Sequence, residues 1–133
     1  MNIYRKEIIV QHKDLDELNH VNNVVYLQWV QDIASAHWQT LATEDMLKKY
    51  SWVVLKHEIE YFGQAFLNDH LQVSTWVDSS EGFRSIRQAE FHHTGTKKLL
   101  VRARTTWCLL DSTTLRLKRI EQDIYTKFHG GSS

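Results

Sequence analysis

The chain has 133 residues, and its 16 lysines and arginines balance 16 aspartates and glutamates, so it carries no formal net charge. This balance argues against a nucleic-acid or anionic-membrane partner, because proteins that bind polyanions normally have a basic excess or a run of Lys and Arg. The length fits one domain, and 42% hydrophobic with 24% charged residues excludes an intrinsically disordered chain.

Signals of cellular compartment are few. The single cysteine, Cys108, lies in an apolar run, so no intrachain disulfide is available and the thiol is predicted to be buried. The first ten residues mix charged and apolar side chains, unlike a signal peptide, and no stretch approaches the roughly 20 apolar residues of a membrane span. We therefore expect a cytoplasmic protein in which residues 1–129 form one domain and residues 130–133 a flexible tail.

The first predicted elements are a strand at residues 3–11 and a long helix at 24–41. Apolar side chains in the second segment recur at steps of three and four and form two adjacent stripes. A helix that is apolar over so much of its circumference must be largely enclosed by other elements. Asn22 and Asn23 stand where an N-cap is expected, since an Asn side-chain oxygen accepts from the free amides of the first helical turn.

After this helix the apolar period changes to two, which predicts strands. The alternation runs through residues 55–61 and 71–77, and further strands are predicted at 83–93 and 99–110. Short connections imply an antiparallel sheet, and the long helix is the only element available to cover its apolar face. A short C-terminal helix is expected at about residues 121–128.

Residues 14–23, DLDELNHVNN, are the least ordinary segment, and they lie between the first strand and the long helix. Helix N-termini present outward-pointing amides and favour negative charge, so an oxyanion can bind there. A thioester carbonyl would have its developing charge stabilised, and an upstream carboxylate could act as general base or attack the carbonyl directly. Composition alone favours a simpler interpretation, a polar loop with a good N-cap, because Asp and Asn are common turn residues.

A family resemblance favours the chemical interpretation. Asp14-Leu15-Asp16, His20-Val21-Asn22-Asn23 and Tyr26-Leu27 resemble the D-x-D-x-x-x-H-V-N-N-x-x-Y-L signature of acyl-CoA thioesterases of the 4-hydroxybenzoyl-CoA thioesterase type. Weaker similarity follows at residues 59–71 and 103–111. The resemblance implies the hotdog fold, an α+β architecture in which an antiparallel sheet of five to six strands wraps around one long central helix. It also implies hydrolysis of an acyl-CoA substrate to free acid and CoA, without a cofactor.

Carried over residue by residue, the resemblance assigns Asp16 as the catalytic carboxylate, either base or nucleophile, and Asn23 as the source of an oxyanion-stabilising backbone N–H. Asp14 competes for the catalytic role, although its spacing favours a part in ordering the loop. His20 is a third catalytic candidate, and a histidine in a turn is more often structural.

Three residues depart from the family pattern. Gln64 stands where the family usually has proline, and Asn19 and Asn68 replace glycines. Both asparagine positions are expected to need a positive φ, which Asn tolerates.

Substrate-binding candidates are spread along the chain: Asn22, Tyr26, Tyr61, Arg84 and Arg87. The two arginines could meet CoA phosphates through charge-assisted hydrogen bonds. The alternative interpretation is that these arginines lie on a solvated face of the sheet and form cross-strand ion pairs. No metal site is expected, because the adjacent His92 and His93 should point to opposite faces of a strand and no cysteine supports zinc.

The resemblance also implies a homodimer, or a dimer of such dimers, with the site between subunits. A non-catalytic acyl-thioester binding module on the same fold is the alternative function. The residues leave open the acyl group and the choice between CoA and acyl-carrier protein.

Overall fold

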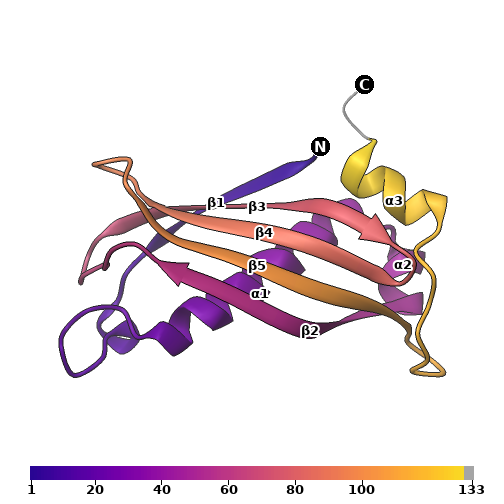
Figure 1. Cartoon of the computed structure of the whole chain (residues 1–133), viewed down its shortest axis with the longest axis horizontal. Helices are drawn as coiled ribbons and strands as arrows, with labels where there is room; N and C mark the ends of the chain where they lie inside the picture. Colours follow the sequence, from indigo (N-terminus) through magenta and orange to yellow (C-terminus); the bar gives the residue numbers. More distant parts are fainter. Residues whose placement is uncertain (131–133) are drawn as a thin grey trace.

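The computed structural model of the chain describes residues 1–130 and has one antiparallel sheet packed on one long helix (Figure 1). The elements in chain order are β1 (Ile3–Ile9), the 3-10 turn η1 (His12–Asp14), α1 (Asn23–Leu41), α2 (Glu44–Lys49), β2 (Tyr50–Tyr61), β3 (His70–Glu81), β4 (Arg84–His93), β5 (Leu99–Asp111) and α3 (Gln122–His129). The five strands lie in the order β1-β3-β4-β5-β2, and every neighbouring pair is antiparallel. The expected α+β class is confirmed. Residues 131–133 of the expected tail lie outside the described residues.

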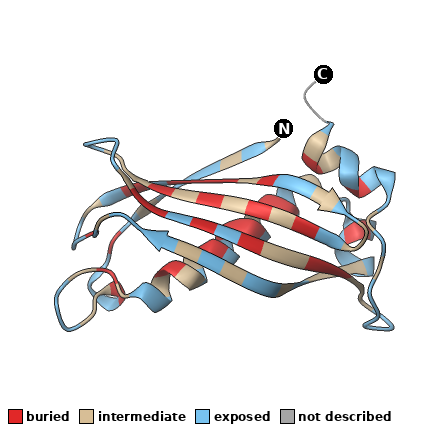
Figure 2. Cartoon of the chain, in the orientation of Figure 1, coloured by how far each residue is buried: buried red, intermediate tan, exposed pale blue. Residues whose placement is uncertain are grey.

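Helix α1 crosses one face of the sheet and forms the core with it (Figure 2). The predicted helix is confirmed and begins one residue earlier, at Asn23. Buried strand residues that face the helix alternate along β3, β4 and β5: Leu71, Val73, Val77, Ala89, Phe91, Val101, Ala103 and Leu109. Fully burying a Val, Leu, Ile or Phe side chain contributes roughly 1.5–3 kcal/mol, so this contact is the main source of the fold's stability.

Strand β2 departs from the simple alternation that its sequence predicts. The register against β5 shifts between Val54 and Lys56, which leaves Leu55 in a bulge with 52% of its surface exposed. One extra residue reverses which side chains face the helix, because side chains in a strand alternate with a period of two. The sequence predicts that Leu55 lies on the same side of the strand as His57 and Ile59. The bulge places it on the other side.

The expectation that one helix alone covers the sheet is wrong. The predicted C-terminal helix exists as α3, and its buried Ile124 and Phe128 join Trp38 in a second apolar cluster. The short helix α2 has no counterpart among the predicted elements, and its Met46 belongs to the same cluster. Together α2 and α3 close the end of the core at which α1 terminates (Figure 1).

Two further sequence expectations can be compared with the structure. Cys108 is a free, buried thiol, as predicted, and burial raises its pKa. Within residues 1–130, none of the helices combines the length and apolarity that crossing a bilayer requires.

A buried polar group interrupts the apolar contact of α1 with the sheet. His37 is 1% exposed; its Nδ1 accepts from Arg87 Nη1 at 2.8 Å, and its Nε2 donates to Asn2 Oδ1 at 2.7 Å. A guanidinium only donates, so the ring is neutral with its proton on Nε2. Burial, followed by the charge of Arg87, lowers the pKa of His37 from 6.5 to about 4.

Acid should therefore destabilise the protein before its carboxylates titrate. Between pH 6.5 and about 4 the unfolded chain binds a proton at His37 that the folded chain does not. The free energy of unfolding should fall across this window as the pH falls, by on the order of 2–3 kcal/mol. Urea denaturation at several pH values measures this, and His37→Gln should show a shallower slope. An equal slope in the two proteins would contradict the assignment.

Candidate active site

The segment that the sequence singles out folds into a small hairpin before α1. Leu15 and Val21 form an antiparallel bridge, and the Asp16 N–H donates to the His20 carbonyl at 2.9 Å. Asn19 closes the turn with φ of 63°, and its N–H donates to the Asp16 carbonyl at 3.0 Å. The expected positive φ at Asn19 is confirmed, and the turn brings Asp16 opposite His20.

Asp14 is directed into the protein. One carboxylate oxygen accepts from the Gln11 N–H at 2.9 Å, and the Asp14 carbonyl accepts from the Asn22 N–H at 3.0 Å. The side chain is buried. Asp14 therefore ties the chain before the hairpin to the start of α1 and does not offer its carboxylate to solvent.

Asp16, in contrast, is both oriented and reachable. Its Oδ1 accepts from the Leu18 N–H at 2.9 Å and from the His20 N–H at 3.4 Å. Its Oδ2 lies 3.3 Å from His20 Nδ1, and the side chain is 29% exposed. The backbone of the turn holds one oxygen, and the second oxygen lies beside His20 on a side chain that is partly exposed to solvent.

The N-terminus of α1 provides the second half of the site. Asn22 is the N-cap, and its Oδ1 accepts from the Val24 N–H at 3.0 Å. Asn23 is the first helical residue, and in the part of the chain that the structure describes its N–H donates to no acceptor. Asn23 is an exposed residue, and its N–H lies at the positive end of a 19-residue helix, where an oxyanion is stabilised.

A second loop, between β2 and β3, packs against the hairpin. The Val21 N–H donates to the Ala65 carbonyl at 2.9 Å, and His20 bridges Phe66. Asn68 has φ of 70°, as expected, and its N–H donates to the Val10 carbonyl at 3.0 Å. The loop is therefore well anchored although Gln64 and Asn68 replace the family's proline and glycine.

Of the substrate-binding candidates, Tyr61 lies near this region and Tyr26 is enclosed. Tyr61 ends β2, half exposed, with its ring centroid 5.9 Å from that of Tyr26. Tyr26 is 2% exposed and packs edge-on against Trp29 and Phe91. Burial is the main cause that raises its pKa to about 12. Tyr26 is a core residue, because its helix position faces the sheet.

The arginine candidates lie away from Asp16 within one chain. Arg84 begins β4, whereas the other end of β4, at His93, lies next to Asp69 of the second loop. Those nine steps along a strand span about 30 Å. Arg84 is exposed, and Arg87 is buried against α1, so only Arg84 is open to a phosphate from solvent.

Apart from Phe62, the apolar side chains at the rim of this site were not identified from the sequence. Leu18, Val24, Phe62 and Phe66 are all exposed on the two loops and the first turn of α1. The signal was present, since large apolar residues in otherwise polar loops are unusual. No group of three or more His, Cys, Asp or Glu side chains among residues 1–130 is arranged to hold a metal ion.

Comparisons with known proteins place the chain in a family and give its fold. Residues 1–128 match the family described as the acyl-ACP thioesterase N-terminal domain. Comparison with curated protein sequences gives no match.

Three solved structures illustrate the structural similarity. Slr0204, a 1,4-dihydroxy-2-naphthoyl-CoA thioesterase from Synechocystis, superposes with a TM-score of 0.82 at 17% identity, covering 96% of each chain. YbaW, a probable thioesterase from Escherichia coli, superposes with a TM-score of 0.78 at 23% identity, covering 92% of this chain and 94% of that one. The hypothetical protein SAV2348 from Staphylococcus aureus, solved in complex with CoA, superposes with a TM-score of 0.83 at 13% identity. The match covers 95% of this chain and 81% of that one. These likenesses establish the fold, which is the expected hotdog fold.

Proposed function

The chain belongs to the acyl-ACP thioesterase N-terminal domain family, and from that membership we propose that it hydrolyses an acyl thioester to a carboxylic acid and a thiol. One observation carries the proposal. The Asp16 carboxylate is held by loop amides on the hairpin that leads into α1, and that helix begins at Asn23, an exposed residue whose N–H has no acceptor in the described chain. A base or nucleophile and an oxyanion donor are the two groups that acyl transfer requires.

In the proposed reaction the thioester carbonyl oxygen accepts from the Asn23 N–H. In the general-base route Asp16 takes a proton from water, the water oxygen bonds to the carbonyl carbon, and the carbon–sulfur bond breaks. The proton then passes to the leaving thiolate. In the nucleophilic route an Asp16 oxygen bonds to the carbonyl carbon and expels the thiolate, and water then cleaves the mixed anhydride. Both routes develop negative charge on the same carbonyl oxygen, at the positive end of α1.

The neighbouring residues take supporting roles in this proposal. His20 Nδ1, 3.3 Å from Asp16 Oδ2, positions the carboxylate. Asn22 acts through the helix, because its side chain caps Val24. Tyr61 borders the acyl group at the rim. Arg84 can meet a substrate bound at Asp16 only if a second subunit supplies it, given its distance along β4.

The proposed substrate is an acyl-CoA, with an acyl-carrier protein as the alternative thiol. Slr0204 is a CoA thioesterase and SAV2348 was solved in complex with CoA, whereas the matching family is named for acyl-ACP. Turnover of the same acyl group on the two carriers distinguishes them.

Asp16→Asn should lower kcat by about a hundredfold or more, because the amide is neither a base nor a nucleophile. Release of free thiol from a panel of acyl-CoAs measures this. Glu17→Gln is the matched control, since Glu17 is the exposed carboxylate next in the chain. Full turnover by Asp16→Asn would refute the site. Binding of acyl-CoA without turnover in the unmodified protein would instead support the non-catalytic module.

Single turnover in heavy-oxygen water separates the general-base route from the nucleophilic route, because label enters the Asp16 carboxylate only through an anhydride.

Asn23→Pro removes the proposed oxyanion donor and leaves the helix start intact. Proline is favoured at the first helical position and lacks an N–H. Asn22 already has φ of −65° and ψ of 136°, the extended conformation that a residue before proline prefers. The expected result is a kcat about 100- to 1,000-fold lower in a protein that unfolds normally in urea. Asn23→Ala keeps the N–H and should lose little activity. A folded Asn23→Pro protein with full activity would exclude this amide.

We also propose a homodimer joined through β2, with a dimer of dimers as the larger assembly. β2 is an edge strand of twelve residues, and Val53 and Leu55 on it are exposed. A long edge with unpaired backbone groups and exposed apolar side chains favours pairing with a second chain.

Replacing Val53 and Leu55 together by lysine should yield a monomer, because charge on an edge strand opposes strand pairing. Light scattering after size exclusion measures the mass. The control is Ile9→Lys, an exposed residue on the opposite edge strand, β1. A dimer that survives the β2 change and is lost with Ile9→Lys would place the interface on β1.

A further inference from the structure

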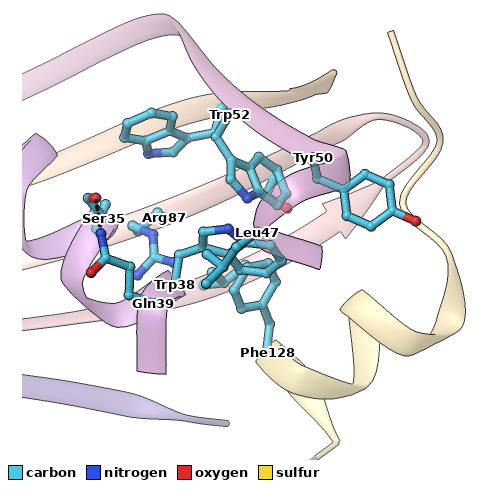
Figure 3. Close-up of a pocket in the computed structure, with 12 residues that line it drawn as sticks. Ser35, Trp38, Gln39, Leu47, Tyr50, Trp52, Arg87 and Phe128 are labelled. Atoms are coloured by element: carbon cyan, nitrogen blue, oxygen red, sulfur yellow. Dashed lines mark hydrogen bonds between the residues drawn. The ribbon is translucent and has the colours of Figure 1, made fainter. Parts of the chain in front are cut away.

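A cavity of about 220 Å³ lies between the C-terminal half of α1 and the sheet (Figure 3). Its lining comes from α1, β2, β3, β4, β5 and α3, with Leu47 from α2. Asn23 and Ser35, which lines the cavity, are twelve residues apart on α1, or about 18 Å. The cavity is therefore distinct from the site at Asp16, and one chain is sufficient to form it.

The cavity contains a buried cation that lacks a counter-ion. Arg87 is 5% exposed, and among residues 1–130 no carboxylate lies within ion-pair distance of it. Its Nη1 donates to His37 and to Thr75 Oγ1, at 2.8 and 3.2 Å. Its other nitrogens have no acceptor among those residues, and they are not among the fully buried unpartnered atoms, so they are open to the cavity. Burial lowers the pKa of Arg87 to about 10, so the guanidinium is charged at neutral pH. Because His37 is neutral, no anionic group in the described chain pairs with this charge, and burying a charge without a counter-ion is costly.

Two hydrogen-bond donors in the lining are buried and unsatisfied. Nε1 of Trp52 and Nε1 of Trp107 are buried without an acceptor in the described chain. A buried indole N–H usually finds a partner. The other buried unsatisfied atoms are on Tyr26 and Thr94, which do not line this cavity. The lining thus presents two buried indole N–H groups without an acceptor and a guanidinium without a counter-ion.

Much of the remaining lining is aromatic. The rings of Trp38, Trp52 and Phe128 lie 5.6 to 5.9 Å apart, centroid to centroid, and the Arg87 guanidinium is 5.6 Å from the Phe128 ring. An apolar cavity of about 150 Å³ is enough to hold benzene. The volume here therefore accommodates one ring bearing a small polar group.

We propose that this cavity binds a small, flat carboxylate. Its two oxygens accept from the Arg87 guanidinium and from the indole N–H groups of Trp52 and Trp107, and its apolar part packs against the side of the aromatic cluster that lines the cavity. A carboxylate matches the donors because it only accepts and pairs with a planar guanidinium. The purely structural account of Arg87, support of His37 and Thr75, predicts a loss of stability in Arg87 variants and no ligand.

Calorimetric titration with benzoate, and with benzamide as its neutral counterpart of similar shape, tests the proposal. The unmodified protein should bind benzoate at least about tenfold more tightly than benzamide, because the charged pair is lost. Arg87→Met should abolish this preference, and benzoate should raise the Tm of the unmodified protein only. No binding of benzoate, or equal binding of both compounds, would overturn the proposal.

Trp52→Phe and Trp107→Phe each remove one N–H and keep an aromatic ring, so each should weaken benzoate binding by about tenfold. They keep the test decisive if Arg87→Met fails to fold. Trp76→Phe is the matched control, since Trp76 does not line the cavity and its Nε1 already donates to Asp78 at 3.2 Å. Unchanged affinity for benzoate in both tryptophan variants would contradict the proposed hydrogen bonds from the two indole N–H groups.

Discussion

Burial of one long helix against one antiparallel sheet is the constraint on which the rest of this structure depends. One face of α1 is apolar, and so is one face of the sheet, so neither element is stable without the other. Buried residues such as Val30 and Ile33 hold the helix along β3, β4 and β5. The two ends of α1 are therefore fixed relative to the sheet, and each end has a different chemical environment.

At the N-terminal end of α1, backbone hydrogen bonds fix the positions of the hairpin and of the loop beside it. The hairpin before α1 and the loop before β3 are joined through Val21 and Ala65, and through Val10 and Asp69. Left-handed residues at Asn19 and Asn68 allow the tight turns that this network requires. The direction of the Asp16 carboxylate thus depends on backbone geometry, and the same geometry leaves the first amide of α1 without an acceptor in the described chain.

At the C-terminal end the core contains a charge. A protein interior rarely contains an arginine without a carboxylate, because moving a charge out of water is costly. Here the guanidinium of Arg87 has only neutral acceptors, His37 and Thr75, and an aromatic ring beside it. Contact between α1 and the sheet elsewhere compensates for this cost, so the fold can keep a polar cavity at some expense of stability.

The sequence by itself determined the elements whose signals are local. The helix that begins at Asn23, the alternation of Leu71 to Val77 and the left-handed turn residue Asn19 depend on neighbours only a few positions away. Only the tertiary structure decided the bulge at Leu55, which is defined by the register with β5, and the places of Tyr26 and Arg87. Arg87 contacts residues that lie 12 and 50 positions away in the sequence. A local hydrophobic pattern cannot predict such contacts, because only the folded chain brings these residues together.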